Sequence, residues 1–97
     1  MRFGLSEKDF EILNKVVILP LKKAGLKVSV FGSRANGKFK KYSDIDICFE
    51  GNISDVELFK IKSEIEESDV SIKVDIVDFK DFPQTFVNNI VNEKIDL

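Results

Sequence analysis

Two aspartates separated by a single residue follow a basic, glycine-containing turn in this sequence. Asp44 and Asp46 alternate with Ile45, so in a strand both carboxylates point to one face, roughly 6 to 7 Å apart. Carboxylates at this spacing suit Mg²⁺, which takes oxygen ligands and leaves its other positions to water or substrate phosphates. Two such ions, about 3.5 to 4 Å apart, would stabilise the entering and leaving oxygens of an in-line displacement at phosphorus. We therefore expect metal-assisted chemistry on a phosphate substrate here.

Gly32 and Ser33, just before these aspartates, suit the phosphate end of such a substrate. Glycine lets the backbone approach phosphate oxygens closely, and free N–H groups at the start of a helical turn attract anions. The Ser33 hydroxyl adds a donor, and Arg34 or a nearby lysine would neutralise the leaving phosphates. Alternatives remain open for each part: an ordinary turn, a solvated aspartate pair, or a solubilising lysine loop.

A third carboxylate is expected from the apolar run at residues 72–79. In a strand, Val74 and Ile76 share one face and Asp75 takes the other. Asp75 is therefore the candidate to complete the acidic cluster. Asp78 is the less favoured substitute, because alternation places it on the Val74 face.

The composition indicates one globular domain, residues 1–97, with 43% hydrophobic and 33% charged residues. The absence of histidine excludes Ser-His and Cys-His catalysis and ordinary zinc sites. A net charge of −2 argues against general nucleic-acid binding. We find no membrane span or signal peptide and expect a cytoplasmic protein, in which the single cysteine, Cys48, fills a strand interior.

The elements that would position these residues alternate between helical and strand patterns. A helix is expected from Ser6 to Gly25, kinked or divided at Pro20. Further elements are a strand at 27–31, a helical turn at 33–36, a strand at 43–50, a helix from Ser54 to about Glu67 buried through Leu58, Ile61 and Ile65 with help from Phe59, a strand at 72–79, and a helix from Pro83 packed by Phe86, Val87, Ile90 and Val91. This order predicts a two-layer α+β (α/β) fold, with helices on one sheet face and the aspartate face open.

The combined motif resembles the signature of the DNA polymerase β-like nucleotidyltransferase superfamily: Gly32-Ser33, ten residues, then Asp44-Ile45-Asp46. The segment from Gly32 to Gly37 is similar to that of the minimal nucleotidyltransferases. The similarity continues through residues 41–44, residues 74–79 and the last helix. Asn36 departs from the Arg or Lys of many relatives, which leaves one phosphate or partner contact without its usual side chain.

The resemblance implies a mixed sheet of the polymerase β-like fold and transfer of a nucleoside monophosphate from a triphosphate, ATP being the expected donor, to a hydroxyl group. Carried over by position, it assigns nucleotide binding to Gly32, Ser33, Arg34, Lys41 and Ser43, and catalysis together with the ligation of two Mg²⁺ ions to Asp44, Asp46 and Asp75. In this assignment Asp75 also helps to activate the acceptor.

The resemblance also implies a partner. Minimal nucleotidyltransferases of the MntA type act as antitoxins beside HEPN-domain toxins encoded nearby, and some transfer AMP to a tyrosine of that toxin. A chain of 97 residues has little room for an acceptor-binding domain, so a second polypeptide is expected to supply the acceptor. Two alternatives stay open: a module that neutralises its partner by binding alone, and a small-molecule nucleotidylyltransferase. Phe3, Phe82 and Phe86 are candidates for a homodimer or hetero-oligomer surface, or for ordinary core edge.

Overall fold

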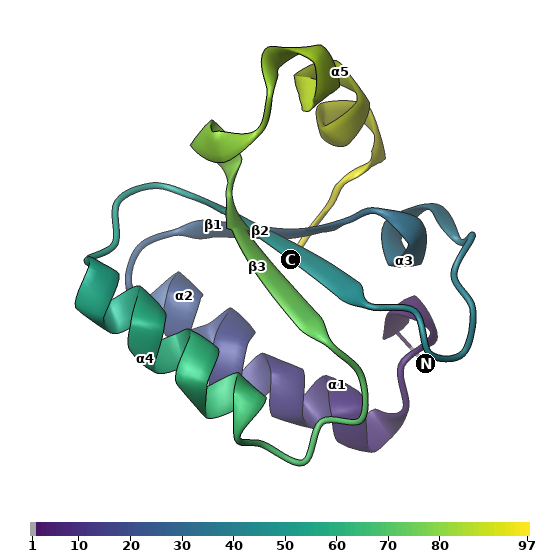
Figure 1. Cartoon of the computed structure of the whole chain (residues 1–97), viewed down its shortest axis with the longest axis vertical. Helices are drawn as coiled ribbons and strands as arrows, with labels where there is room; N and C mark the ends of the chain where they lie inside the picture. Colours follow the sequence, from purple (N-terminus) through teal and green to yellow (C-terminus); the bar gives the residue numbers. More distant parts are fainter. Residues whose placement is uncertain (1) are drawn as a thin grey trace.

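A four-stranded sheet with the strand order β3-β2-β1-β4 organises the chain in the computed structural model, which describes residues 2–97 (Figure 1). In chain order the elements are η1 (Arg2–Gly4), α1 (Glu7–Leu13), η2 (Asn14–Ile18), α2 (Leu19–Lys23), β1 (Lys27–Phe31), α3 (Ser33–Asn36), β2 (Ile45–Glu50), α4 (Asp55–Glu66), β3 (Val74–Asp78), η3 (Phe79–Asp81), α5 (Gln84–Glu93) and β4 (Ile95–Asp96). Strand β1 is antiparallel to β2 and β4, whereas β2 and β3 are parallel. The predicted two-layer α+β fold with a mixed sheet is confirmed.

The N-terminal helix forms as its sequence signals predict. The Ser6 hydroxyl accepts a hydrogen bond from the Asp9 N–H at 3.1 Å and caps α1. Because Pro20 has no N–H to donate, the helix widens into the π-helical turn η2 before α2 begins. Gly25, with φ of +87°, ends α2, and Leu26 N–H returns to the Leu21 carbonyl at 3.2 Å.

Helix α4 is the crossover that makes β2 and β3 parallel neighbours. Its first turn is capped by the Ser54 hydroxyl, which accepts from the Glu57 N–H at 3.1 Å. The entry to β3 is tied to α1, because the buried Asp9 carboxylate accepts hydrogen bonds from the Ser71 N–H and hydroxyl. These contacts fix the strand that carries Asp75.

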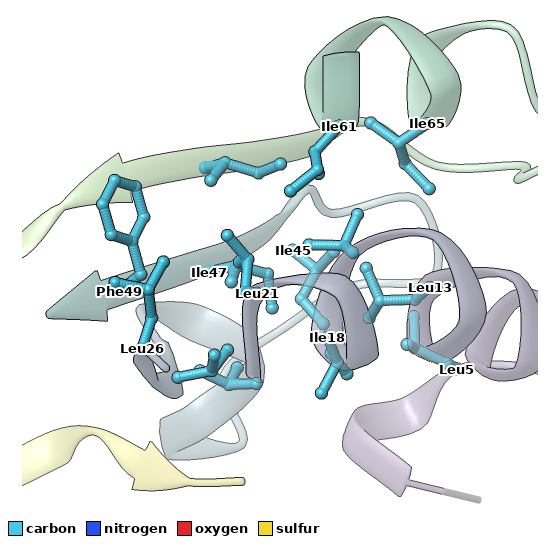
Figure 2. Packing of buried hydrophobic residues seen from close by; sticks show 14 residues of the cluster. Leu5, Leu13, Ile18, Leu21, Leu26, Ile45, Ile47, Phe49, Ile61 and Ile65 are labelled. Carbon is cyan, nitrogen blue, oxygen red and sulfur yellow. The ribbon is translucent and has the colours of Figure 1, made fainter. Parts of the chain in front are cut away.

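The core lies between the sheet and the row of α1, η2, α2 and α4 (Figure 2). Ile45, Ile47 and Phe49 are the buried face of β2, each at most 1% exposed. The β-branched and aromatic side chains of this face fit the pleated surface that the helices cover. Burying these residues orients their alternating neighbour Asp46 to the opposite face.

Two packing predictions need correction, and one strand was not predicted. Phe59 does not help to bury α4, because it lies on the solvent side of that helix and is 72% exposed. Helix α5 has no buried residue, and Phe86 is 55% exposed. It stands apart from α1, α2 and α4, on the other side of the sheet (Figure 1), where Val87 and Ile90 are half-buried and Phe86 and Val91 stay exposed. Strand β4, which the sequence pattern did not predict, pairs with β1 after α5.

The aspartate face is less open than predicted, because the C-terminal segment crosses part of it. Phe31 lies opposite Asp46 in the register, and its ring packs edge-on against Phe82 with centroids 5.0 Å apart. Ser29 and Cys48, also paired on this face, are buried. Burial raises the pKa of the Cys48 thiol to about 11, as expected for an inert filler. In the part of the chain that the structure describes, no helix is long and apolar enough to cross a membrane.

Candidate active site

Two of the three predicted carboxylates lie side by side on neighbouring strands. Asp46 in β2 is directly opposite Asp75 in β3, and the parallel register points both to the same sheet face. Asp44 is not on this strand as predicted, because β2 begins at Ile45 and Asp44 is an exposed loop residue just before it. The cluster therefore combines two strand-held carboxylates with one that depends on the preceding loop.

Gly32 approaches Asp46 more closely than any other residue type allows. A Cβ atom built on Gly32 would lie 2.5 Å from Asp46 Oδ2. Its φ of +76° also lies in the region that favours glycine. The turn after β1 thus brings its backbone against the acidic cluster, which agrees with the predicted junction of a phosphate site and a metal site.

The three carboxylates affect one another electrostatically. Burial, the charges of Asp75 and Asp44, and a hydrogen bond shared with Asp75 raise the pKa of Asp46 to about 6. A Lys73 ammonium lies 3.5 Å from Asp75 Oδ1 and partly offsets this repulsion. Lys73 was not predicted as a site residue, although its position two residues before Asp75 was a signal for it.

This donor set suits a hard divalent cation. Carboxylate oxygens on adjacent strands are the ligands that Mg²⁺ takes, and a cation would relieve the repulsion at Asp46. Among residues 2–97, no three acidic side chains already stand in a metal-binding arrangement. Metal ligation by Asp46 and Asp75 therefore stays a prediction.

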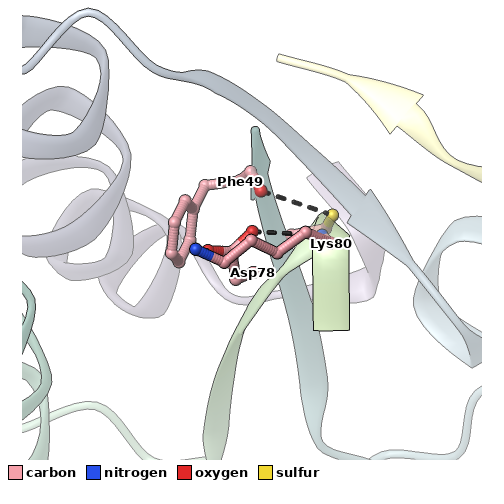
Figure 3. Close-up of polar contacts among 4 residues, drawn as sticks. Phe49, Asp78 and Lys80 are labelled. Atoms are coloured by element: carbon pink, nitrogen blue, oxygen red, sulfur yellow. Dashed lines mark hydrogen bonds and ion pairs between the residues drawn. The ribbon is translucent and has the colours of Figure 1, made fainter. Parts of the chain in front are cut away.

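Asp78, the less favoured substitute for Asp75, has a structural role. Its Oδ1 accepts from the Lys80 N–H at 3.1 Å, and its Oδ2 lies 3.5 Å from the Lys80 ammonium (Figure 3). Asp78 is paired with Phe49, whose ring lies in the core, so its carboxylate is on the helix-covered side. This placement supports Asp75 as the third acidic residue.

The predicted phosphate-binding residues lie along a short, cross-linked loop. Ser33 begins α3, where the first intrahelical bonds run from later N–H groups to the Gly32 carbonyl. The Ser43 hydroxyl accepts from the Lys40 N–H at 2.8 Å, which leaves its own proton free to donate. The Lys41 side chain is at the surface, with its ammonium 5.4 Å from the Tyr42 ring centroid. Nucleotide contacts by Gly32, Ser33, Lys41 and Ser43 remain predictions.

Arg34 is placed differently from these residues. It is only 3% exposed, and its guanidinium donates to the carbonyls of Phe3, Lys41 and Ser43 at 2.9, 3.2 and 3.0 Å. Three of its N–H groups are therefore directed to backbone oxygens of the protein. Its predicted nucleotide contact is untested, and the three hydrogen bonds show that Arg34 also holds the loop.

Comparison with known proteins gives the family. The family described as "Polymerase beta, Nucleotidyltransferase" matches residues 11–97. A protein of Methanocaldococcus jannaschii named "putative protein adenylyltransferase" is 33% identical over 89 residues, which cover 90% of this chain and 95% of that protein. The chain belongs to the polymerase β nucleotidyltransferase family. Membership makes it a nucleotidyltransferase and confirms the resemblance read from Gly32-Ser33 and Asp44-Ile45-Asp46.

Solved structures of other proteins show the same fold. A structure described as a "putative minimal nucleotidyltransferase" superposes with a TM-score of 0.72 at 22% identity, covering 96% of this chain and 97% of that one. The crystal structure of a toxin-antitoxin with AMP-PNP superposes with a TM-score of 0.64 at 20% identity, covering 86% of this chain and 70% of that one. At these identities the similarity establishes the fold alone.

Proposed function

We propose that this nucleotidyltransferase is a Mg²⁺-dependent protein adenylyltransferase. It transfers AMP from ATP to a tyrosine hydroxyl of a HEPN-type toxin encoded nearby, and thereby acts as an antitoxin. The observation that carries the proposal is the juxtaposition of Asp46, Asp75 and the Gly32 backbone at one end of the sheet. The name of the M. jannaschii relative and the toxin-antitoxin complex with AMP-PNP support the choice of reaction and partner.

The turn after β1 holds the triphosphate in this proposal. The Gly32 and Ser33 backbone N–H groups and the Ser33 hydroxyl donate to phosphate oxygens at the start of α3. Ser43 and Lys41, on the loop that leads to Asp44, add a hydroxyl and a positive charge. These groups bind the donor end and orient its leaving pyrophosphate.

The carboxylates act at the reacting phosphorus. Mg²⁺, when bound, supplies positive charge that stabilises the transition state of phosphoryl transfer. Asp44, Asp46 and Asp75 hold the cations, and Asp75 also accepts the proton of the tyrosine hydroxyl. The tyrosine oxygen forms its bond to the α-phosphorus while the bond from that phosphorus to pyrophosphate breaks.

The acceptor approaches from the side of β3. A cavity of about 450 Å³ lies beside Asp75. Its lining comes from α4 and the segment around β3: Lys62, Ile65, Glu66, Val70, Ile72, Lys73, Val74, Asp75 and Ile76. Because β3 is an edge strand, this side is not covered by a further strand. The cavity lies on the α4 side of β3, whereas the Asp75 carboxylate points to the opposite sheet face, so it is the open edge of β3, and not this cavity, that we propose as the path of the acceptor.

Intact mass measurement of the partner tests the proposal. The toxin encoded beside this chain is incubated with wild-type protein, ATP and Mg²⁺, and we expect it to gain one AMP. Asp46→Asn and Asp75→Asn abolish the gain, whereas Asp78→Asn, the matched control on the same strand, preserves most of it. Equal modification by the wild type and Asp46→Asn contradicts the proposal.

A second candidate function is neutralisation by binding alone, which the exposed face of α5 favours. Phe86 and Val91 are 55% and 49% exposed, so a partner has apolar surface to cover. Under this candidate, the Asp46→Asn variant neutralises the toxin as well as the wild type does. Under the adenylyltransferase proposal, it binds the toxin but leaves it active.

A further inference from the structure

The buried guanidinium of Arg34 lies at the centre of the loop that leads to Asp44. Its Nε donates to the Ser43 carbonyl and its Nη2 to the Lys41 carbonyl, at 3.0 and 3.2 Å. The same loop is closed on itself between Lys40 and Ser43 by a backbone bond of 3.0 Å and a side-chain bond of 2.8 Å. Asp44 follows directly, between this closed turn and Ile45, whose N–H donates to the Lys73 carbonyl at 3.0 Å.

The N-terminal turn completes the enclosure of Arg34. Arg34 Nη1 donates to the Phe3 carbonyl at 2.9 Å, which joins η1 to α3 across 31 positions of the sequence. Figure 1 shows α3 beside this N-terminal turn. Phe3 is the one described non-glycine residue with positive φ, at 55°, and such backbone persists where surrounding contacts impose it.

Phe39 forms the remaining wall. Its ring centroid lies 4.9 Å from the Arg34 guanidinium carbon, a cation–π distance. The ring also packs directly on Gly4, where an added Cβ would collide with Phe39 Cε2 and Cζ. Gly4 also has φ of +71°, so both the backbone of the turn and the contact with the Phe39 ring require glycine here.

We propose that Arg34 is a positioning residue, and that Arg34, Phe39 and the Phe3–Gly4 turn together fix the loop that presents Ser43 and Asp44 to the active site. The argument against a phosphate contact is geometric: three of the guanidinium N–H groups are directed to carbonyls of the protein. The inference rests on the proposed function for its catalytic consequence, but its structural consequence can be measured without any reaction.

Arg34→Gln and Arg34→Lys test the inference by amide hydrogen exchange. Neither side chain spans three carbonyls, because only the planar fork of arginine presents donors in those directions. We expect exchange at residues 38–44 to become at least about tenfold faster in both variants, with the β1–β2 amides little changed. If Arg34→Lys keeps wild-type exchange and only raises KM for ATP, Arg34 is a phosphate ligand and the inference is wrong.

Gly4→Ala perturbs the same loop from a position outside the active site. Its Cβ displaces Phe39, so exchange at residues 38–44 rises and kcat for AMP transfer falls about 10- to 100-fold. Gly25→Ala is the matched control, since Gly25 has a similar φ of +87° but no neighbour within 4 Å of an added Cβ. It carries the same backbone strain and leaves loop exchange and kcat unchanged. Equal effects of the two glycine variants overturn the inference.

The two proposals fail separately. If the wild type transfers no AMP, the proposed function fails, and hydrogen exchange at residues 38–44 still decides the role of Arg34. If the wild type transfers AMP and the Arg34 and Gly4 variants leave loop exchange at the wild-type rate, the positioning inference alone fails. Val17→Ala, a fully buried core change, controls for a general loss of stability.

Discussion

The loop from Gly32 to Asp46 and the C-terminal helix α5 differ in how far contacts with the rest of the chain hold them. In the loop, a buried arginine, a glycine against Asp46 and a closed turn at Lys40–Ser43 supply contacts within the chain. In α5, no side chain is buried, and Phe86 and Val91 face solvent. The contrast indicates that the chain organises the donor half of its site by itself and leaves apolar surface for another molecule.

Gly32→Ala is expected to give the largest effect in the loop. The new Cβ lies 2.5 Å from Asp46 Oδ2 and the φ of +76° is strained for alanine, so AMP transfer falls by about 100-fold or more. Gly37→Ala is the control, because Gly37 has φ of +82° and open space around an added Cβ. Both are measured by transfer rate and circular dichroism. Similar losses in both variants would mean that strain, and not contact with Asp46, is responsible.

Asp46→Asn tests the electrostatics of the same region in the metal-free protein. The folded-state pKa of about 6 is above the ordinary 3.8, so the folded state binds the proton more tightly. Stability from this group is therefore present below about pH 4 and is lost as pH rises through 6. We expect Asp46→Asn to be more stable than the wild type at pH 7 by about 1 kcal/mol after allowance for solvent screening.

Thermal melting without divalent cations, from pH 4 to pH 8, measures this difference. The two proteins converge near pH 4. A wild type that is more stable than Asp46→Asn at pH 7 contradicts the repulsion among Asp44, Asp46 and Asp75.

Phe86→Ser should give the smallest effect on the isolated chain. Because Phe86 packs on no core, the free energy of unfolding changes by no more than about 0.5 kcal/mol. Binding to the partner weakens if α5 is the contact surface, as measured by calorimetric titration. Phe59→Ser, at a 72% exposed position on α4, is the matched control and leaves binding unchanged. A large loss of stability in Phe86→Ser alone would show that α5 does pack on the domain.

Local signals predicted most of the fold. Ser6, Pro20 and Gly25 set the limits of the first helix through caps and a missing donor, and these effects depend on neighbours in the sequence. The alternation from Ile45 to Glu50 also placed Asp46 on the face opposite the core. Such alternating patterns predict the fold well because the burial of one strand face determines the direction of every side chain along the strand.

The errors concern contacts between distant segments, short elements and an irregular turn. The burial of Arg34 depends on the Phe3 carbonyl, which is 31 residues away in the sequence and leaves no pattern there. Strand β4 has two residues, too few for a periodic signal. The predicted strand included Asp44, but the closed turn at Lys40–Ser43 extends to the residue before it, and β2 begins only at Ile45. Helix α5 is amphipathic as predicted, but periodicity alone does not say which surface covers an apolar face.

Divalent-cation binding by the isolated chain tests the central claim most directly. Mn²⁺ is titrated in the presence of AMP-PNP into the wild type, Asp46→Asn, Asp75→Asn and the control Asp78→Asn, with bound Mn²⁺ measured by electron paramagnetic resonance. The account predicts binding by the wild type and Asp78→Asn, and at least about a tenfold loss of affinity in Asp46→Asn and Asp75→Asn. Equal Mn²⁺ affinity in all four proteins would contradict the assignment of Asp46 and Asp75 as the metal-binding pair.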